Sequence, residues 1–266
     1  MFIISMDPIV TIGPISVRWY GIMVALAVLT VVLWTLWQVK KGANISYDTA
    51  LTAALVGIPS GIIFAKVLHV IDLWQYYLQN PGQILSGAGL TIYGAVLGAA
   101  LGIWIFSKVS KFQFSYFADM IAPGIILSQA VGRIGCTING CCYGLQTSLP
   151  WGVVYTHPNS LAPLGVPVLP TQIYEIIYNL IVFGVLLTLR RRIKPDGSLF
   201  LIYLSLYSLW RLGIGFLRDG TPFLFGLHQA QVIGIIILAI AIPVLALKTR
   251  WVKEEKSEGE PEDINL

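Results

Sequence analysis

Long apolar stretches without charge alternate with short polar segments along the chain. Residues 19–39 carry no charge between Trp19 and Val39, and residues 220–247 carry none between Gly220 and Leu247. A helix needs about 20 apolar residues to cross the hydrocarbon core of a bilayer. The pattern predicts transmembrane helices at about 16–39, 49–71, 88–107, 117–135, 171–190, 198–217 and 229–247. We therefore expect an all-α, polytopic integral membrane protein.

The composition supports this fold class over a soluble one. Of the 266 residues, 56% are hydrophobic and only 11% are charged, whereas soluble domains carry about 25% charged residues. A large soluble core is the alternative, but apolar stretches of about 10 to 14 residues suffice for buried soluble helices. The first apolar run is also too long for the core of a signal peptide, so we expect it to remain as the first helix.

The positive charges predict how the helices are oriented. Basic clusters follow the first, third, fifth and seventh predicted helices: Lys40 and Lys41; Lys108 and Lys111; Arg190, Arg191, Arg192 and Lys194; Lys248, Arg250 and Lys253. Such clusters favour the cytoplasmic side, so we expect the N-terminus outside and the C-terminus in the cytoplasm. We expect a transmembrane domain over 1–248 with an external loop at about 136–170, and a charged cytoplasmic tail over 249–266.

Polar residues inside the predicted helices gather in the outer half of the bilayer. Ionisable groups there are costly and are therefore candidates for function. Arg211 lies about 13 residues into its helix, which is roughly 20 Å from the cytoplasmic side. The others are Arg18, Tyr20, Lys66, His69, Tyr93, Arg133 and Glu175. This convergence predicts a polar reaction site near the outer surface.

Each of these residues also has a structural interpretation. The long side chains of Arg18 and Lys66 could simply extend to the membrane interface. Tyr20 and Tyr93 could belong to the aromatic belt found there, and His69 could form hydrogen bonds at a helix end.

Arg133 and Arg211 need an anionic partner at that depth, and Glu175 supplies one as a structural ion pair. Two or more cations against one carboxylate still leave positive charge. A lipid phosphate is the natural anion at that depth, and arginine matches its geometry.

The densest candidate motif runs from Gly132 to Gly144, with the sequence GRIGCTINGCCYG. Its glycines let the backbone approach a ligand closely, and Arg133 and Asn139 add side-chain donors, which suits a phosphate or glycerol headgroup. A metal site or a disulfide are alternatives for the cysteines. No C-x-x-C pair or nearby histidine gives a zinc spacing, so we expect no metal and interpret them as small residues in a packed loop. The cysteines are Cys136, Cys141 and Cys142.

One further spacing concerns packing. Gly94, Gly98 and Gly102 recur every four residues in the third predicted helix. Small residues at this spacing let two membrane helices approach closely. We expect this face to contact a neighbouring helix.

With these motifs in order, the sequence strongly resembles the prolipoprotein diacylglyceryl transferases over about residues 6–235. The resemblance is carried by Arg18-Trp19-Tyr20-Gly21, Gly89-Leu90-Thr91-Ile92-Tyr93-Gly94, Gly132-Arg133-Ile134-Gly135, Pro170-Thr171-Gln172-Ile173-Tyr174-Glu175, Tyr207 with Arg211, and Arg218. It implies transfer of a diacylglyceryl group from phosphatidylglycerol to the thiol of a lipobox cysteine, releasing glycerol 1-phosphate. The implied location is the bacterial inner membrane. The implied partners are phosphatidylglycerol, prolipoprotein signal peptides and membrane lipids, with no nucleic acid and no cofactor.

The resemblance also implies roles for particular residues. The catalytic candidates are Arg133, Arg211, Tyr93, Tyr20, His69 and Glu175. The candidates for binding phosphatidylglycerol are Arg133, Asn139, Gly140, Gly144, Arg211, Arg218 and Lys66.

This sequence departs from the family's usual residues at several positions. Tyr93 and Leu169 stand where the family usually has histidine, and Cys141 and Gly215 stand where it usually has glutamate. Cys136 replaces the usual asparagine, and Lys66 replaces the usual arginine. Two candidates, His69 and Glu175, therefore remain for the proton acceptor, with Tyr93 as a relay or a lipid-positioning residue.

Two alternatives to an active transferase stay open. One is a catalytically inactive homologue that binds lipid or peptide. The other is a transporter or channel, which would carry polar residues on both sides of the midplane.

Overall fold

The computed structural model describes residues 1–85, 89–220 and 222–251. In this part of the chain, seven helices are long and apolar enough to cross a membrane. They are α1 (Trp19–Lys40), α2 (Tyr47–Asp72), α4 (Ile92–Val109), α5 (Phe114–Asn139), α6 (Thr171–Leu189), α7 (Ser198–Gly215) and α8 (Gln229–Lys248). The protein is thus a polytopic, mostly helical membrane protein, as the apolar pattern predicted. Residues 252–266 of the predicted tail lie outside the described residues.

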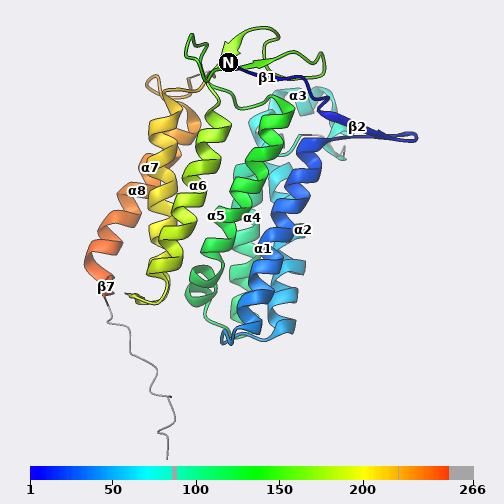
Figure 1. Ribbon diagram of the computed structural model, residues 1–266. Coiled ribbons are helices and arrows are strands. Elements are labelled where there is room, and N and C mark those ends of the chain that lie inside the picture. The colour runs from blue at the N-terminus through cyan, green and yellow to red at the C-terminus, as the bar shows by residue number, and fades with distance from the viewer. Residues whose placement is uncertain (86–88, 221, 252–266) are drawn as a thin grey trace, which may run out of the picture.

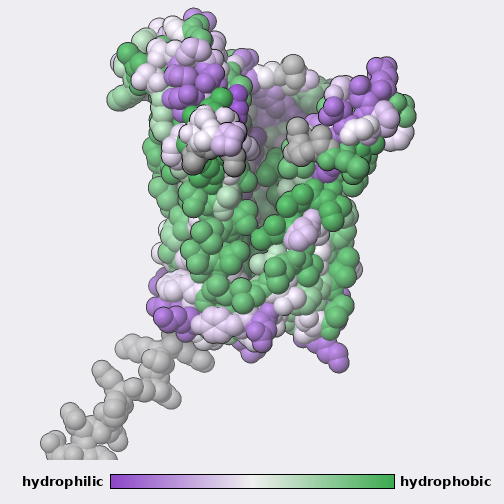
Figure 2. Space-filling view, turned by 90° about the vertical axis from the view of Figure 1, so that its right-hand side faces the viewer, coloured by the Kyte–Doolittle hydropathy of each residue, from purple (hydrophilic) through white to green (hydrophobic). Residues whose placement is uncertain are grey.

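The outer surface of the helix bundle is suited to lipid. Figure 2 shows a broad apolar band between two hydrophilic ends. Many large apolar side chains of the helices are exposed, for example Leu55 of α2 at 72% and Ile181 of α6 at 59%. A contiguous apolar surface of this size is unusual on a soluble monomer, and a bilayer covers it without cost.

Helices α2 and α4 pack tightly through the glycines at four-residue spacing. A Cβ atom added at Gly98 would lie 2.5 Å from the carbonyl oxygen of Ser60. An added Cβ at Gly94 or Gly102 would collide with Phe64 or Ser60, respectively. The expected close approach of a neighbouring helix is therefore confirmed, and α2 is that neighbour.

Helix α5 is the most buried span and organises the rest of the bundle. It packs against α1 and α6 along much of its length, touches α7, and meets α4 at only a few positions. A core joins α5, α6 and α7, and consists of Ala122, Ile126, Val182, Leu186, Leu199 and Tyr203. Helix α8 packs on α7 at the far side of the bundle (Figure 1).

Short strands cover the end of the bundle at which α5 finishes and α6 begins (Figure 1). Strand β1 (Phe2–Ile4) pairs in parallel with β4 (Val153–Tyr155), which pairs antiparallel with β5 (Pro167–Val168). Strands β2 (Ile9–Ile12) and β3 (Ile15–Arg18) form a hairpin before α1. The same end holds the short helices α3 (Trp74–Gln79) and η1 (Pro81–Leu85).

The opposite end carries the basic loops. There β6 (Ile193–Lys194) pairs with β7 (Arg250–Trp251), so the chain beyond α8 returns to the loop between α6 and α7. The described chain also has two cavities at this end, of about 240 and 550 Å³. None of the predicted site residues lines either one.

Helix α5 ends at Asn139, and Gly140 follows in the left-handed conformation with φ of 69°. Glycine adopts this conformation without steric cost and is common just after a helix. Cys136 and Asn139 consequently lie on the last helical turn, and the loop that leads to α6 begins at Gly140.

Candidate active site

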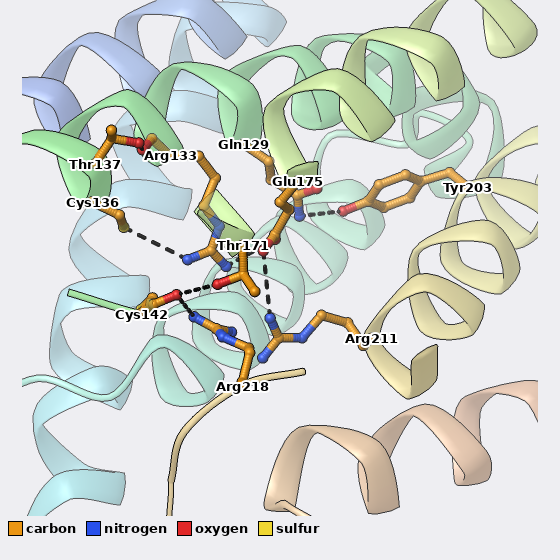
Figure 3. A network of polar contacts seen from close by, with 10 residues as sticks. All are labelled: Gln129, Arg133, Cys136, Thr137, Cys142, Thr171, Glu175, Tyr203, Arg211 and Arg218. Carbon is orange, nitrogen blue, oxygen red and sulfur yellow. Dashed lines mark hydrogen bonds and ion pairs between the residues drawn. The ribbon is translucent and has the colours of Figure 1, made fainter. Parts of the chain in front are cut away.

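A buried carboxylate lies between two arginines from neighbouring helices (Figure 3). Glu175 Oε1 is 2.9 Å from Arg133 Nη2, and Glu175 Oε2 is 3.6 Å from Arg211 Nη1. The Glu175 side chain is 2% exposed, against 17% for Arg133 and 16% for Arg211. Three helices, α5, α6 and α7, thus each contribute one charge to the same point.

The depth of this cluster follows from its positions along the helices. Arg133 lies six residues before the end of α5, Glu175 lies four residues after the start of α6, and Arg211 lies four residues before the end of α7. At 1.5 Å per residue, the three lie about 6 to 9 Å inside the helix ends. The convergence of these residues at one end, predicted from helix depth, is confirmed.

The cluster is electrostatically incomplete. Two guanidinium groups share one carboxylate, so one positive charge remains. Within the described residues, the buried atoms Glu175 Oε1 and Arg211 Nη1 have no hydrogen bond of good geometry, so both contacts are ion pairs with imperfect alignment. Buried polar atoms in native proteins are nearly always hydrogen-bonded. The surplus positive charge and the unbonded Arg211 Nη1 donor would suit a further anion.

Two more polar residues extend the cluster. Tyr93, on the second residue of α4, lies within electrostatic range of Arg211 and Arg218. Arg218 follows α7, and its Nη2 donates to the carbonyl oxygen of Cys142 at 3.2 Å. Arg133, Arg211 and Arg218 therefore lie near one another, with Tyr93 beside the last two.

The cysteine loop is anchored onto the start of α6. Thr171 Oγ1 donates to the carbonyl oxygen of Cys142 at 2.7 Å, and Gln172 Nε2 donates to that of Cys141 at 2.8 Å. Both anchoring side chains come from residues only 1% exposed. The three cysteines are free, and their sulfur atoms lie within 4.8 Å of one another. Arg133 Nη1 donates to Cys136 Sγ at 3.6 Å, which joins this group to the arginine cluster.

The residues predicted to hold a glycerol headgroup already serve the protein's own structure. Asn139 is 4% exposed and accepts a hydrogen bond from Arg18 at 3.0 Å. The N–H of Gly140 bonds to Cys136, and that of Gly144 donates to the carbonyl oxygen of Leu169 at 2.8 Å. Binding of a ligand by Asn139, Gly140 and Gly144 stays a prediction. The backbone N–H groups of the two glycines are already hydrogen-bonded within the protein and do not take part in it.

Lys66 and His69 form a separate group at the end of α2. Lys66 Nζ donates to the Tyr77 hydroxyl at 3.4 Å and to the carbonyl oxygen of Gln83 at 3.3 Å. The His69 ring meets the edge of Tyr77, with ring centroids 5.9 Å apart, and covers the backbone of Gly89. These contacts lie toward α3 and η1 rather than toward Glu175.

Tyr20 lies on the other side of the cluster, at the start of α1. Its Cα would be 3.3 Å from a Cβ added at Gly135, so α1 and α5 approach closely there. Tyr20 is within electrostatic range of Arg133 and Cys136, and it is 42% exposed.

Sequence reasoning assigned no role to several buried polar residues near the site. Thr171 and Gln172 hold the cysteine loop, and Gln129 Nε2 donates to the Tyr203 hydroxyl at 2.8 Å. Asn179 is fully buried, one turn from Glu175 on α6, with neither side-chain atom hydrogen-bonded among the described residues. The available signal was polar residues at four-residue spacing, Thr171, Glu175 and Asn179, in an otherwise apolar helix.

The fold and this cluster define a class of protein: a multi-pass membrane protein with a buried cluster of two arginines and one carboxylate near its helix ends. Figure 2 shows a hollow at the hydrophilic end that carries the short strands, with apolar surface below it on both sides. A family model described as prolipoprotein diacylglyceryl transferase matches residues 8–247. The chain belongs to the prolipoprotein diacylglyceryl transferase family.

Individual relatives match over nearly the whole chain. A phosphatidylglycerol–prolipoprotein diacylglyceryl transferase of Dehalococcoides mccartyi is 54% identical over 255 residues, covering 96% of this chain and 98% of the relative. Enzymes of the same name are 38% identical over 230 residues in Clostridioides difficile, covering 85% and 88%, and 35% identical over 253 residues in Trichormus variabilis, covering 90% and 88%.

Proposed function

We propose that the protein transfers a diacylglyceryl group from phosphatidylglycerol to the thiol of the lipobox cysteine of a prolipoprotein. Glycerol 1-phosphate is the second product. The names of the relatives support this activity. The observation that carries it in the structure is the pair of arginines sharing one buried carboxylate, Glu175.

In this reaction the arginines bind the phosphate that leaves. The lipobox sulfur forms a bond to the terminal glyceryl carbon of the diacylglyceryl group, and the bond between that carbon and the phosphate oxygen breaks. Negative charge then develops on the phosphate, and fixed cations in a dry site stabilise such charge strongly. Arg133 is the primary phosphate ligand, Arg211 assists it, and Arg218 lies where it can bind the headgroup.

Glu175 positions both arginines rather than accepting the proton. Each of its carboxylate oxygens already contacts a guanidinium group, Oε1 that of Arg133 and Oε2 that of Arg211. Tyr93 lies beside Arg211 and relays a proton or positions the lipid. His69 remains a candidate acceptor only if the peptide approaches along α2, because its ring contacts are with Tyr77 and Gly89.

The remaining assignments concern lipid entry and topology. Lys66 lies toward η1 and binds the headgroup on its way into the site, while Tyr20, Asn139, Gly140 and Gly144 line the side formed by α1 and the cysteine loop.

The end with the arginine cluster faces the outside of a bacterial inner membrane. The transferase domain spans 1–248, and 249–266 form a cytoplasmic tail. Reporter tags inserted after Gly144 and after Lys41 test this orientation, with the first expected outside and the second inside.

One assay tests the activity. Purified protein is mixed with phosphatidylglycerol and a lipobox peptide, and thioether-linked product is measured by mass spectrometry. Arg133→Ala should abolish the product, and Lys40→Ala, an exposed lysine at the basic end, should leave it unchanged. If wild-type protein binds both substrates yet forms no product where a D. mccartyi relative does, the chain is an inactive binding homologue and the proposal fails.

A further inference from the structure

Three cysteine side chains converge beside the arginine cluster although no metal spacing is evident in the sequence. Cys136 lies on the last turn of α5, and Cys141 and Cys142 follow the helix cap at Gly140. The three sulfur atoms all lie within 4.8 Å of one another. Three sulfurs on a tetrahedral zinc ion are about 3.8 Å apart, given a Zn–S distance near 2.3 Å. Small side-chain rotations therefore suffice to place all three on one ion.

The backbone is arranged to keep the sulfurs together. Cys142 has φ of 64°, a left-handed conformation that non-glycine residues adopt rarely and at a cost. The carbonyl oxygens of Cys141 and Cys142 are held by buried Gln172 and Thr171. Strain that is fixed by buried hydrogen bonds commonly marks a functional position.

The local charge favours an anionic metal–thiolate complex. Three thiolates and one divalent ion together carry one negative charge. Arg133 Nη1 already donates to Cys136 Sγ, and Arg218 Nη2 contacts the backbone of Cys142. The surplus of guanidinium groups over the single carboxylate of Glu175 thus balances the complex. The cluster can also be reached from one side, because Cys136 is buried whereas Cys142 is exposed.

We propose that Cys136, Cys141 and Cys142 bind a thiophilic d¹⁰ cation, with zinc as the principal candidate, and that its fourth ligand is the thiol of the lipobox cysteine. This second part rests on the proposed transferase function. Three protein ligands with one open position are characteristic of catalytic zinc sites, and a thiol bound to zinc loses its proton.

The reaction then balances without a side-chain base. The substrate thiol releases its proton to water on binding the ion. The resulting thiolate forms the new carbon–sulfur bond, and the phosphate leaves as an anion bound to Arg133. Arg133 is itself hydrogen-bonded to Cys136 Sγ. This arrangement places the nucleophile and the leaving group on adjacent parts of the site, and it requires no proton transfer to Glu175.

Metal binding is tested first, without reference to activity. Reduced, metal-stripped protein in detergent is titrated with Cd²⁺ and with Zn²⁺, and cadmium–thiolate absorption and bound metal per chain are measured. We expect one ion per wild-type chain and at least a tenfold weaker affinity in Cys136→Ser, Cys141→Ser and Cys142→Ser. Arg211→Ala serves as the control, because it should lose transferase activity and still bind the ion. Absence of stoichiometric binding in reduced wild-type protein overturns the site, as does binding that survives in the triple serine variant.

Activity tests the second part separately. Removing the metal should lower the transfer rate at least tenfold, and adding back Zn²⁺ should restore it. Full activity of metal-free protein overturns the thiol-activating role. Failure of the transferase proposal itself is recognised differently, because wild-type protein would then bind the ion and form no product with or without it.

Discussion

Arg18 Nη1 donates to Asn139 Oδ1 at 3.0 Å, which joins the first residue before α1 to the last residue of α5 across 121 positions of sequence. Arg18 also reaches the carbonyl oxygen of Asn159, at 3.4 Å. The Arg18 side chain therefore connects the N-terminal hairpin, the end of α5 and the loop between α5 and α6. Arg18 thus has specific partners within the protein and does not merely extend toward water.

Removing this contact should destabilise the protein measurably. Arg18→Ala leaves the buried Oδ1 of Asn139 without its charged donor, and hydrogen bonds to charged groups contribute about 1.5–3 kcal/mol. We expect a double-mutant cycle of Arg18→Ala and Asn139→Ala, followed by unfolding in detergent, to give a coupling energy of about that size. Additive effects would show that the two residues act independently.

Arg133→Lys should be nearly as damaging as Arg133→Ala. The two terminal nitrogens of Arg133 contact different groups, Glu175 Oε1 and Cys136 Sγ, and lysine has a single ammonium that cannot reproduce this fork. Loss of a preorganised charge-stabilising donor costs about 100- to 1000-fold in rate. Initial rates with phosphatidylglycerol and a lipobox peptide measure the loss. Wild-type rates in Arg133→Lys would remove the phosphate assignment.

Two glycines of the motif should respond oppositely to alanine. A Cβ at Gly144 would lie 2.6 Å from the carbonyl oxygen of Leu217 and 2.7 Å from Thr171, whereas one at Gly132 meets nothing within 4 Å. Gly144→Ala should therefore lower the melting temperature and loosen the cysteine loop. Gly132→Ala should be neutral or stabilising, since alanine is favoured over glycine in helices by about 1 kcal/mol. Equal melting temperatures for the two variants would contradict the packing described for Gly144.

His69→Ala should cause only a modest loss of activity. The ring contacts Tyr77 and the backbone of Gly89 and lies apart from Glu175, so its removal affects the region of α3 and η1 first. We expect the rate to fall less than tenfold with no change in its pH profile. A loss as large as that of Arg133→Ala, together with a shifted pH profile, would instead identify His69 as the proton acceptor.

The N-terminal segment should loosen in acid. The backbone N–H of Ile9, and next the side-chain amide of Asn159, lower the pKa of Asp7. Because the folded pKa lies below the unfolded value of about 3.9, the stabilisation is complete above that value and is lost as the pH falls through the folded pKa. Protease cleavage near residues 5–10 should rise over that range in wild-type protein. Asp7→Ala should be cleaved readily at every pH, with Asp48→Ala, at the start of α2, behaving as wild type.

The sequence predicted the spans well because crossing a bilayer constrains it strongly. Charged side chains are costly in hydrocarbon, so long apolar stretches with few charges locate the seven spans. Strands β1 and β4 escaped prediction, because each has three residues and its partner lies some 150 positions away. Their pairing depends on tertiary contacts that no local pattern records.

The candidate site was predictable in depth but not in rotation about the helix axes. Counting residues along the helices placed Arg133, Glu175 and Arg211 at one level, and the structure brings them together. The same count placed Lys66 and His69 at that level, yet their side chains turn toward Tyr77. Which face of α2 meets α4 is decided by the glycines of α4, and that choice carries Lys66 and His69 away from the arginines.

The sparse contact between α4 and α5, together with the hollow visible in Figure 2, bears on how a two-tailed lipid is selected. On the proposed assignment, a donor slides sideways until its phosphate meets Arg133, while both tails stay among neighbouring lipids. This route predicts recognition through the polar group, with chain length and unsaturation set by the surrounding membrane. Lipoproteins made this way would carry a sample of the host bilayer's own fatty acids.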